Sequence, residues 1–238
     1  MNTLTPTWPA PKSVRAYTLL RNHPSLRLPY VDSPRYLDFP QLQMDLSVPS
    51  EPCWIQQTHS TIVSQATESH QYQEADAIIA NTANRVCVIL TADCLPVLLC
   101  DRAGKHVAAI HAGWRGLANG IIENTIAKMN LPPDSLLAWL GPAIGPHAFE
   151  IRKDVYDIFM EKGATPACFH AVNQDQWLAD IYALARLRLE AAGINAIFGG
   201  EYCTYTDKDK FFSYRREGTS AGRLASLIWI QNTSDLAA

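Results

Sequence analysis

Three short apolar runs near the middle of the chain constrain its fold more than any other feature. They span Val86–Leu90, Val97–Cys100 and Val107–Ile110, they are rich in β-branched residues, and turn-forming residues flank them. Runs of this length and composition predict buried strands. The first run leads into a Thr-Ala-Asp-Cys-Leu-Pro segment and the third into a His-Ala-Gly-Trp-Arg-Gly segment, so the thiol of Cys94 and the imidazole of His111 stand at the ends of predicted strands.

Cys94 and His111 are expected to converge, because the ends of neighbouring strands can meet although they are distant in sequence. A third candidate is His59, which follows the apolar Cys53–Ile55. One thiolate and two imidazoles form either a three-ligand zinc site with an open position or a Cys/His nucleophile pair. Each residue taken alone also has an ordinary interpretation, since cysteine is a frequent core residue and most histidines are surface or hydrogen-bonded side chains.

Two acidic residues accompany this candidate site. Asp93 precedes the thiol and can orient a histidine or relay a proton, so we count it with Cys94, His111 and His59 as a catalytic candidate. Asp76 lies in an apolar run and must be paired if it is buried. Either carboxylate can also be purely structural.

Two further segments carry arginines suited to an anionic ligand. The glycine-rich turn after the third run opens a predicted helix, and backbone N–H groups at a helix N-terminus, together with Arg115, can bind a phosphate or carboxylate. The alternative is that both glycines only form a tight turn. Phe211–Gly218 places Arg215 and Arg216 beside aromatic residues, which suits a planar or anionic ligand, but it also suits a surface loop paired to Glu217.

The composition favours a soluble globular protein. The chain has 238 residues, 47% of them hydrophobic, and its formal net charge of −3 gives no electrostatic case for nucleic acid or an anionic membrane as a partner. No apolar run is long enough to span a bilayer, and residues 1–12 lack the apolar stretch of a secretory signal. We therefore expect a cytoplasmic monomer or small homo-oligomer. Six cysteines in a chain of this length are too few for a disulfide scaffold.

The remaining pattern predicts an α+β fold. Helices are predicted over Gly116–Met129, Asp154–Met160 and Gln174–Ala192. Asn173 or Asp175 is the expected cap of the last helix. Further strands are predicted over Leu136–Leu140, Ile194–Phe198 and Leu224–Ile230. Strands and helices mix without strict βα alternation, which favours mixed β-sheets over a doubly wound sheet. No repeat or linker divides the chain, so we expect one domain over residues 1–238, with an irregular, proline-punctuated segment at 1–50.

Several of these segments occur together in a known family. The motifs that carry the resemblance are, in order, Asp76-Ala77, Thr91–Pro96, His111–Gly116, Gly141–Gly145, and Phe212–Arg216 with Gly222-Arg223. They resemble those of the peptidoglycan editing factor family, which is also called the laccase-domain or multicopper polyphenol oxidase family and has members described as purine nucleoside phosphorylases. The resemblance covers roughly residues 50 to 230. It implies a single domain of layered sheets in a sandwich flanked by helices, with zinc bound by His59, Cys94 and His111.

The N-terminal part departs from the family pattern. Members usually carry an arginine followed by a loop with two glycines, and that loop is expected to contribute to the substrate pocket. Here Arg21 is followed by Asn22 and His23, with no glycine. We accordingly take Arg21 as a substrate-binding candidate, beside Arg115 and Arg216.

The resemblance implies an enzyme that acts on small molecules. Its expected activity is purine nucleoside phosphorolysis, which converts adenosine, inosine or methylthioadenosine and phosphate to free base and sugar 1-phosphate, with zinc-dependent adenosine deamination as a second activity. One alternative is a Cys/His or zinc amidohydrolase that edits peptidoglycan precursors. Another is a non-enzymatic metal-binding protein whose zinc only ties strand ends together. Copper is disfavoured and polyphenol oxidation is the least expected activity, because one cysteine and two histidines cannot supply several copper centres.

Overall fold

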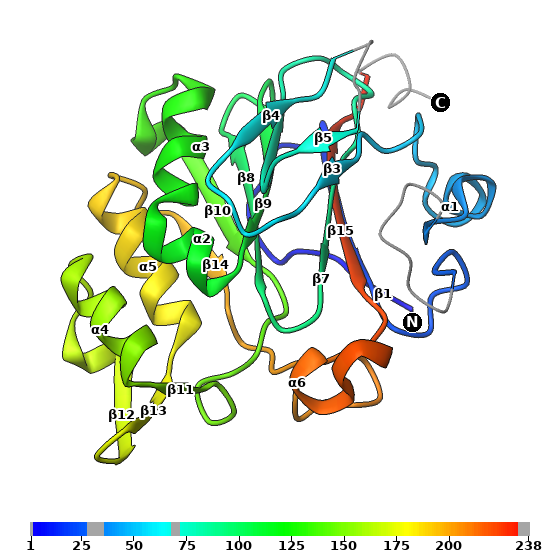
Figure 1. The fold of residues 1–238 in the computed structure, drawn as a ribbon. Helices are drawn as coiled ribbons and strands as arrows, with labels where there is room; N and C mark the ends of the chain where they lie inside the picture. Colours follow the sequence, from blue (N-terminus) through cyan, green and yellow to red (C-terminus); the bar gives the residue numbers. More distant parts are fainter. Residues whose placement is uncertain (1, 28–35, 68–71, 233–238) are drawn as a thin grey trace.

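Two β-sheets packed face to face form the centre of the molecule (Figure 1). The computed structural model describes residues 2–27, 36–67 and 72–232. The first sheet has the strand order β1-β2-β15-β7 and the second has the order β14-β10-β8-β9-β6-β4. The strands of the first are β1 Thr3–Leu4, β2 Val14–Leu19, β7 Cys87–Thr91 and β15 Leu224–Ile230; those of the second are β4 Val63–Gln65, β6 Ala77–Ala80, β8 Leu95–Asp101, β9 Val107–Ala112, β10 Leu136–Leu140 and β14 Ile197–Gly199.

The central strands of the six-stranded sheet are apolar on both faces. In β8, Val97 and Leu99 face the helices, whereas Leu98 and Cys100 pack into the core between the two sheets. Because both faces are covered, these strands appear in the sequence as unbroken apolar runs rather than alternating ones. The three runs predicted as buried strands are therefore confirmed as β7, β8 and β9.

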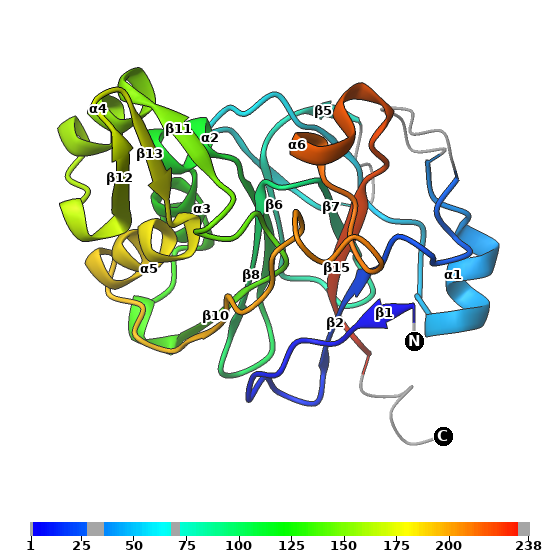
Figure 2. The same ribbon diagram turned by 90° about the horizontal axis from the view of Figure 1, so that it is seen from below.

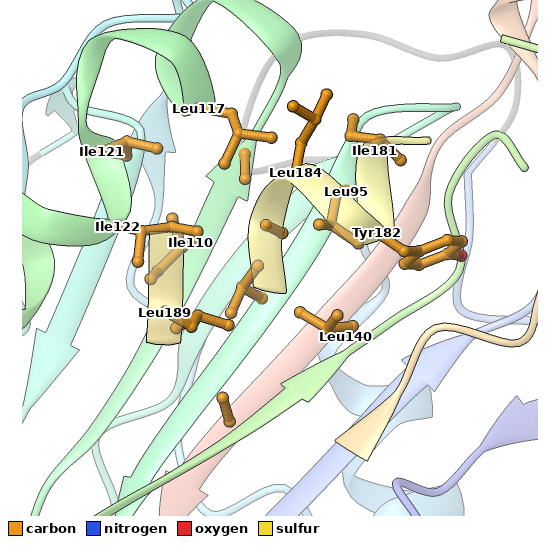
Figure 3. Close-up of a cluster of buried hydrophobic side chains, with 14 of the residues drawn as sticks. Leu95, Ile110, Leu117, Ile121, Ile122, Leu140, Ile181, Tyr182, Leu184 and Leu189 are labelled. Carbon is orange, nitrogen blue, oxygen red and sulfur yellow. The ribbon is translucent and has the colours of Figure 1, made fainter. Parts of the chain in front are cut away.

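Helices cover the outer face of the six-stranded sheet (Figure 2). The helices are α1 Phe39–Leu46, α2 Trp114–Asn119, α3 Ile121–Met129, α4 Lys153–Glu161, α5 Ile181–Ala191 and α6 Tyr214–Glu217. Figure 3 shows Leu117 of α2, Ile121 of α3 and Leu184 of α5 packed over the sheet residues Leu95 and Ile110. Helix α1 packs instead beside the four-stranded sheet. The α+β class, with layered sheets in a sandwich flanked by helices, is confirmed.

The predicted helix over Gly116–Met129 is interrupted. It begins earlier, at Trp114, and divides into α2 and α3 at Gly120. Gly120 has φ +98°, a left-handed conformation that glycine adopts without steric cost. The break lets both short helices turn an apolar face to the same sheet.

The start of the predicted helix over Gln174–Ala192 is wrong. Its first part forms the turn and second strand of a hairpin, in which β12 Phe169–Asn173 pairs with β13 Gln176–Ala179. Helix α5 begins only at Ile181 and is capped by Asp180 rather than by Asn173 or Asp175. Local and tertiary contacts explain the hairpin. The Asn173 side chain accepts from the backbone N–H of Asp175, and the Trp177 ring stacks on Tyr156 with a centroid distance of 4.5 Å.

Smaller elements complete the described chain. They are the strands β3 Ile55–Gln56, β5 Gln73–Glu74 and β11 Glu150–Arg152, and the 3-10 turns Pro133–Ser135, Pro166–Cys168 and Gly218–Ser220. The N-terminal segment is more regular than its prolines predict, because β2 pairs along its full length with β15. Among the described residues, no helix has the length and apolar character needed to cross a membrane.

Candidate metal and substrate site

The structure brings His59, Cys94 and His111 together. Their ligand atoms all lie within 4.8 Å of one another, and Nε2 of His59 is 3.6 Å from Sγ of Cys94. Cys94 lies in the turn between β7 and β8, His111 near the end of β9, and His59 in the loop between β3 and β4. The two histidine rings meet edge to face, with centroids 4.8 Å apart.

The backbone around the cluster has little freedom. Strands β8 and β9 pair so that Pro96 lies opposite His111, which fixes the thiol beside the imidazole. Gly113 closes the site, since a Cβ there would lie 2.5 Å from Cδ2 of His59 and 3.1 Å from Sγ of Cys94. The close approach of these side chains therefore requires a glycine at position 113, in addition to any role of Gly113 in a turn.

Asp76 is the buried acid that organises the cluster. Its carboxylate is 2.7 Å from Nδ1 of His111 and accepts backbone N–H groups of Thr58, His59 and Ser60. Burial alone would raise the pKa of Asp76, but hydrogen bonds from His111 and Ser60 outweigh it and lower this pKa. With Nδ1 bound to a carboxylate, His111 turns Nε2 to the cluster, as histidine ligands of metals commonly do.

Cys94 and His111 shift each other's pKa. Burial would raise the pKa of Cys94, but the charge of His111 and hydrogen bonds from His111 and His59 lower it to about 6. Burial would likewise lower the pKa of His111, but the Cys94 thiolate and Asp76 raise it to about 9. Both shifts favour the charged pair of thiolate and imidazolium, and the thiolate is the form that binds metal or attacks an electrophile.

The donor set fits a metal ion. One thiolate sulfur and two imidazole nitrogens are the ligands that Zn²⁺ and other borderline-soft metals prefer. The described residues bring no fourth His, Cys, Asp or Glu into this cluster, so the protein supplies three ligands. A three-ligand site leaves a position for water or substrate, which is typical of catalytic rather than structural zinc.

A pocket of about 580 Å³ opens beside the cluster. The three candidate ligands lie in its wall together with arginines and aromatic rings. Its other lining residues are Gln57, Leu90, Thr91, Ala92, Asp93, Trp114, Arg115, Ile144, Phe149, Ile181, Tyr214, Arg215 and Arg223. With Asp93 as the single acid among them, this lining favours an anionic ligand that also carries a flat apolar face.

Arg115 lies where the sequence predicted an anion contact. It is exposed in the pocket wall and its guanidinium lies 4.4 Å above the Trp114 ring. Sequence reasoning missed Tyr214, Phe149 and Arg223 as lining residues. The Tyr214 and Arg223 positions belong to motifs that carried the family resemblance, so the signal was present for them, whereas nothing in the sequence marked Phe149.

Asp93 has a different set of partners from those expected. Its carboxylate accepts from the hydroxyls of Thr204 and Ser213 and from the backbone N–H of Arg215. No histidine is among its hydrogen-bond partners in the described chain, and the acid that orients His111 is Asp76. Asp93 therefore ties the loop that carries Cys94 to the opposite wall of the pocket.

Arg21 and Arg216 lie outside the pocket. Both donate to the carboxylate of Glu217, and they line a separate surface hollow with Lys208. Arg216 also donates to three backbone carbonyls, which holds the loop before α6 in place. The structure thus brings Arg215, not its neighbour, to the candidate site, and it favours the surface-pairing interpretation of Arg216.

Comparison with known proteins identifies the family. Residues 38–231 match the family described as multi-copper polyphenol oxidoreductase laccase. The chain belongs to this laccase family. It is 44% identical over 239 residues to the purine nucleoside phosphorylase YfiH of Escherichia coli K12, a match that covers 95% of this chain and 98% of the relative. It is 40% identical over 245 residues to a purine nucleoside phosphorylase of Haemophilus influenzae, covering 97% and 100% of the two chains.

Solved structures share the fold of this laccase family member. A Neisseria meningitidis protein superposes with a TM-score of 0.88 at 42% identity, covering 98% of this chain and all (100%) of that one. YlmD from Geobacillus stearothermophilus superposes with a TM-score of 0.83 over 93% of each chain, and its 23% identity shows the fold alone.

The laccase name of the family implies several copper ions. In the described parts of the chain, the His59, Cys94 and His111 cluster is the one group of possible metal ligands. A single set of one thiolate and two imidazoles suits one metal ion, whereas laccase chemistry needs several copper centres that exchange electrons. The ligands present therefore do not fit polyphenol oxidation.

Proposed function

We propose that the protein is a purine nucleoside phosphorylase with adenosine deamination as a second activity. One observation carries the proposal: cationic Arg115, Arg215 and Arg223 share a single pocket with aromatic rings and with the His59, Cys94 and His111 cluster. A purine nucleoside has a flat base, which the aromatic rings can contact, and phosphate carries negative charge, which the arginines can bind. The relatives named purine nucleoside phosphorylase support the phosphorylase activity.

Arg115 is the proposed phosphate contact. Its guanidinium carbon lies over the Trp114 ring, and no described residue accepts a hydrogen bond from it, so its N–H groups remain available to an anion. Arg215 is less free, since its guanidinium already donates to the backbone carbonyl of Glu150 at 3.0 Å. A planar guanidinium can bind two phosphate oxygens at once, which leaves the other two oxygens in a fixed position, one of them for attack.

The reaction then needs positioning more than acid–base chemistry. A phosphate oxygen forms a bond to C1′ of the ribose, the C1′–N9 bond breaks, and its electron pair leaves with the purine. The purine takes up the proton that monohydrogen phosphate gives up. A phosphate dianion held beside C1′ stabilises the positive charge that develops on the sugar as the bond breaks.

His59, Cys94 and His111 would hold a zinc ion in this pocket. When bound, zinc supplies a Lewis acid that activates water, which suits the hydrolytic removal of the adenine amino group. Asp76 orients His111 for this role. The lowered pKa of Cys94, about 6, favours the thiolate that binds metal.

The phosphate requirement tests the proposal. Adenosine and inosine are incubated with the purified protein over a phosphate titration, and free base and sugar 1-phosphate are measured by chromatography. We expect base release to rise with phosphate and to saturate. Equal base release without phosphate would show hydrolysis instead, and no release from any nucleoside would reject the activity.

A second candidate has its own support in the geometry. Cys94, His111 and Asp76 form a line of thiol, imidazole and buried carboxylate, the arrangement of cysteine nucleophiles that cleave amides. In that case the protein is an amidohydrolase acting on peptidoglycan precursors, and zinc would block the nucleophile. Assays of muramyl peptides with metal-free protein test this candidate directly.

A further inference from the structure

Thr91 lines the pocket, and its buried hydroxyl has no hydrogen-bond partner among the described residues. Thr91, the last residue of β7, is 2% exposed, and its Oγ1 meets no donor or acceptor in the described parts of the chain. The other buried side-chain atoms of this kind belong to residues that do not line the pocket. A buried hydroxyl without a partner costs free energy, and such a group in a binding site points to a bond made only when a ligand is present.

Two other polar side chains that line the pocket, Gln57 and Asp93, have hydrogen-bond partners of their own. The Gln57 amide donates to and accepts from the backbone of Leu90, at 2.8 and 2.7 Å. The carboxylate of Asp93 binds three donors from the loops on the far side of the pocket. The Thr91 hydroxyl differs from them, because it has no hydrogen-bond partner in the described parts of the chain.

The pocket lining combines two kinds of side chain. Trp114 of α2, Ile181 of α5 and Phe149 of the β10–β11 loop are apolar or aromatic. Thr91 at the end of β7 and Arg223 just before β15 are polar, and Thr91 lies opposite Leu224 in the sheet. The faces of a purine match the first kind, and the hydroxyls of a sugar match the second.

We propose that Thr91 binds a ribose hydroxyl and selects ribonucleosides over deoxyribonucleosides. The inference rests on the proposed function and names the sugar class that the pocket accepts. A threonine hydroxyl can donate one hydrogen bond and accept another, as a sugar hydroxyl can. A deoxy sugar would leave Thr91 unpaired in the complex, and sites built in this way reject the analogue that lacks the group.

The variant Thr91→Val tests whether the hydroxyl serves the fold or the ligand. Valine keeps the shape and favours a strand, so the melting temperature of the ligand-free protein should stay unchanged or rise. The matched control is Thr18→Val, the same change in the same sheet, where the buried hydroxyl is paired with Ser226 at 2.9 Å. The control should lower the melting temperature and keep the sugar selectivity. A comparable fall in Thr91→Val would mean a structural role and would overturn the proposal.

Selectivity is measured with adenosine, 2′-deoxyadenosine and 3′-deoxyadenosine at saturating phosphate. For the wild type we expect kcat/KM to be about tenfold lower for at least one deoxynucleoside than for adenosine. Thr91→Val should lose about tenfold with adenosine and little with that deoxynucleoside, and Thr91→Ser should restore the selectivity. An equal loss with all three nucleosides, or no loss with any of them, would overturn the assignment.

Binding separates this inference from the proposed reaction. If the wild type releases no base from any nucleoside, the proposed phosphorolysis fails, and calorimetric titration with the same three nucleosides then tests Thr91 alone. Adenosine binding that weakens about tenfold in Thr91→Val, with no change for one deoxynucleoside, would support the ribose contact. Equal affinities of the two proteins, or no binding of adenosine to the wild type, would reject it.

Discussion

The Asp76 carboxylate lies 2.7 Å from Nδ1 of His111 and also accepts the backbone N–H of His59 at 3.0 Å. One fully buried side chain thus sets the tautomer of one candidate ligand and the backbone position of another. Asp76 would act on a bound metal through these neighbours, so we assign it a positioning role.

We expect Asp76→Asn to weaken zinc binding by about 10- to 100-fold, because partners of ligating histidines tune metal affinity by that amount. Competition with a chromophoric chelator measures the change. The control is Asp101→Asn, since Asp101 is also a buried carboxylate that accepts backbone N–H groups but is the last residue of β8 and lies outside the ligand cluster. Equal zinc affinity in wild type and Asp76→Asn would contradict the positioning role.

Elemental analysis should find one zinc per chain in the wild type. In Cys94→Ser the zinc content should fall strongly, because a serine hydroxyl is a much poorer ligand than a thiolate. Cys203→Ser is the matched control, since Cys203 is likewise a half-buried free cysteine but lies outside the ligand cluster. Unchanged zinc in Cys94→Ser would rule out the ligand assignment.

Alkylation distinguishes a metal ligand from a nucleophile. In the zinc-loaded protein Cys94 should react slowly with iodoacetamide, because the cation engages the sulfur lone pair. After chelation the thiol has a pKa lowered to about 6 by His111 and His59. It is therefore deprotonated above that pH, and its labelling rate should be high at neutral pH and fall as the pH drops through about 6.

Mass-spectrometric mapping of labelled cysteines before and after chelation gives the readout. Cys87 serves as an internal reference, because burial raises its pKa and keeps it unreactive in both states. Fast labelling of Cys94 with zinc still bound would favour covalent catalysis and the amidohydrolase.

Arg115→Leu should raise the KM for phosphate by about tenfold or more while changing the KM for adenosine little, because a charge-assisted hydrogen bond contributes more than a neutral one. Initial rates over both substrate concentrations separate the two constants. Arg15→Leu is the control, since Arg15 is exposed on β2 and does not line the pocket. Equal effects on the KM for phosphate and the KM for adenosine would indicate that phosphate binds elsewhere.

Asp93→Ala should lower the free energy of unfolding by about 2 to 4 kcal/mol, because Thr204, Ser213 and Arg215 lose their shared acceptor. Zinc content should stay close to one per chain, since no candidate ligand contacts this carboxylate. Denaturant unfolding and elemental analysis give the two readouts. A large loss of activity with unchanged stability would restore the catalytic role that the sequence suggested.

Strands β7 to β10 and β15 were predictable because they are buried on both faces, whereas the strand predicted over Ile194–Phe198 is partly exposed and extends only over Ile197–Gly199. Leu136–Leu140 and Leu224–Ile230 have the predicted bounds, and β7, β8 and β9 differ from theirs by one or two residues. The β12–β13 hairpin was not predictable in the same way. Its residues are mostly exposed, so they carry no apolar alternation, and Trp177 matched a helical stripe although its ring packs on Tyr156.

The candidate metal ligands were predictable because few residue types bind metals or act as nucleophiles. Cys94, His59 and His111 stood out because a thiol and imidazoles follow predicted strands. The partners of Asp76 and Asp93 could not be predicted, since both bind groups far away in the chain and nothing local indicates which acid reaches a histidine. The sequence could not separate Arg215 from Arg216 for a similar reason, because only the start of α6 decides which of two adjacent arginines lines the pocket.

The position of β15 in its sheet has a consequence for protein synthesis. This strand lies between β2 and β7, so neither of those strands meets the other without it. All three candidate ligands leave the ribosome in the first half of the chain, but the partners of Asp93 and the strand beside Thr91 come from residues 204–230. A growing chain therefore exposes two apolar strand edges until its last strand is made, and such edges are where nascent proteins aggregate or recruit chaperones.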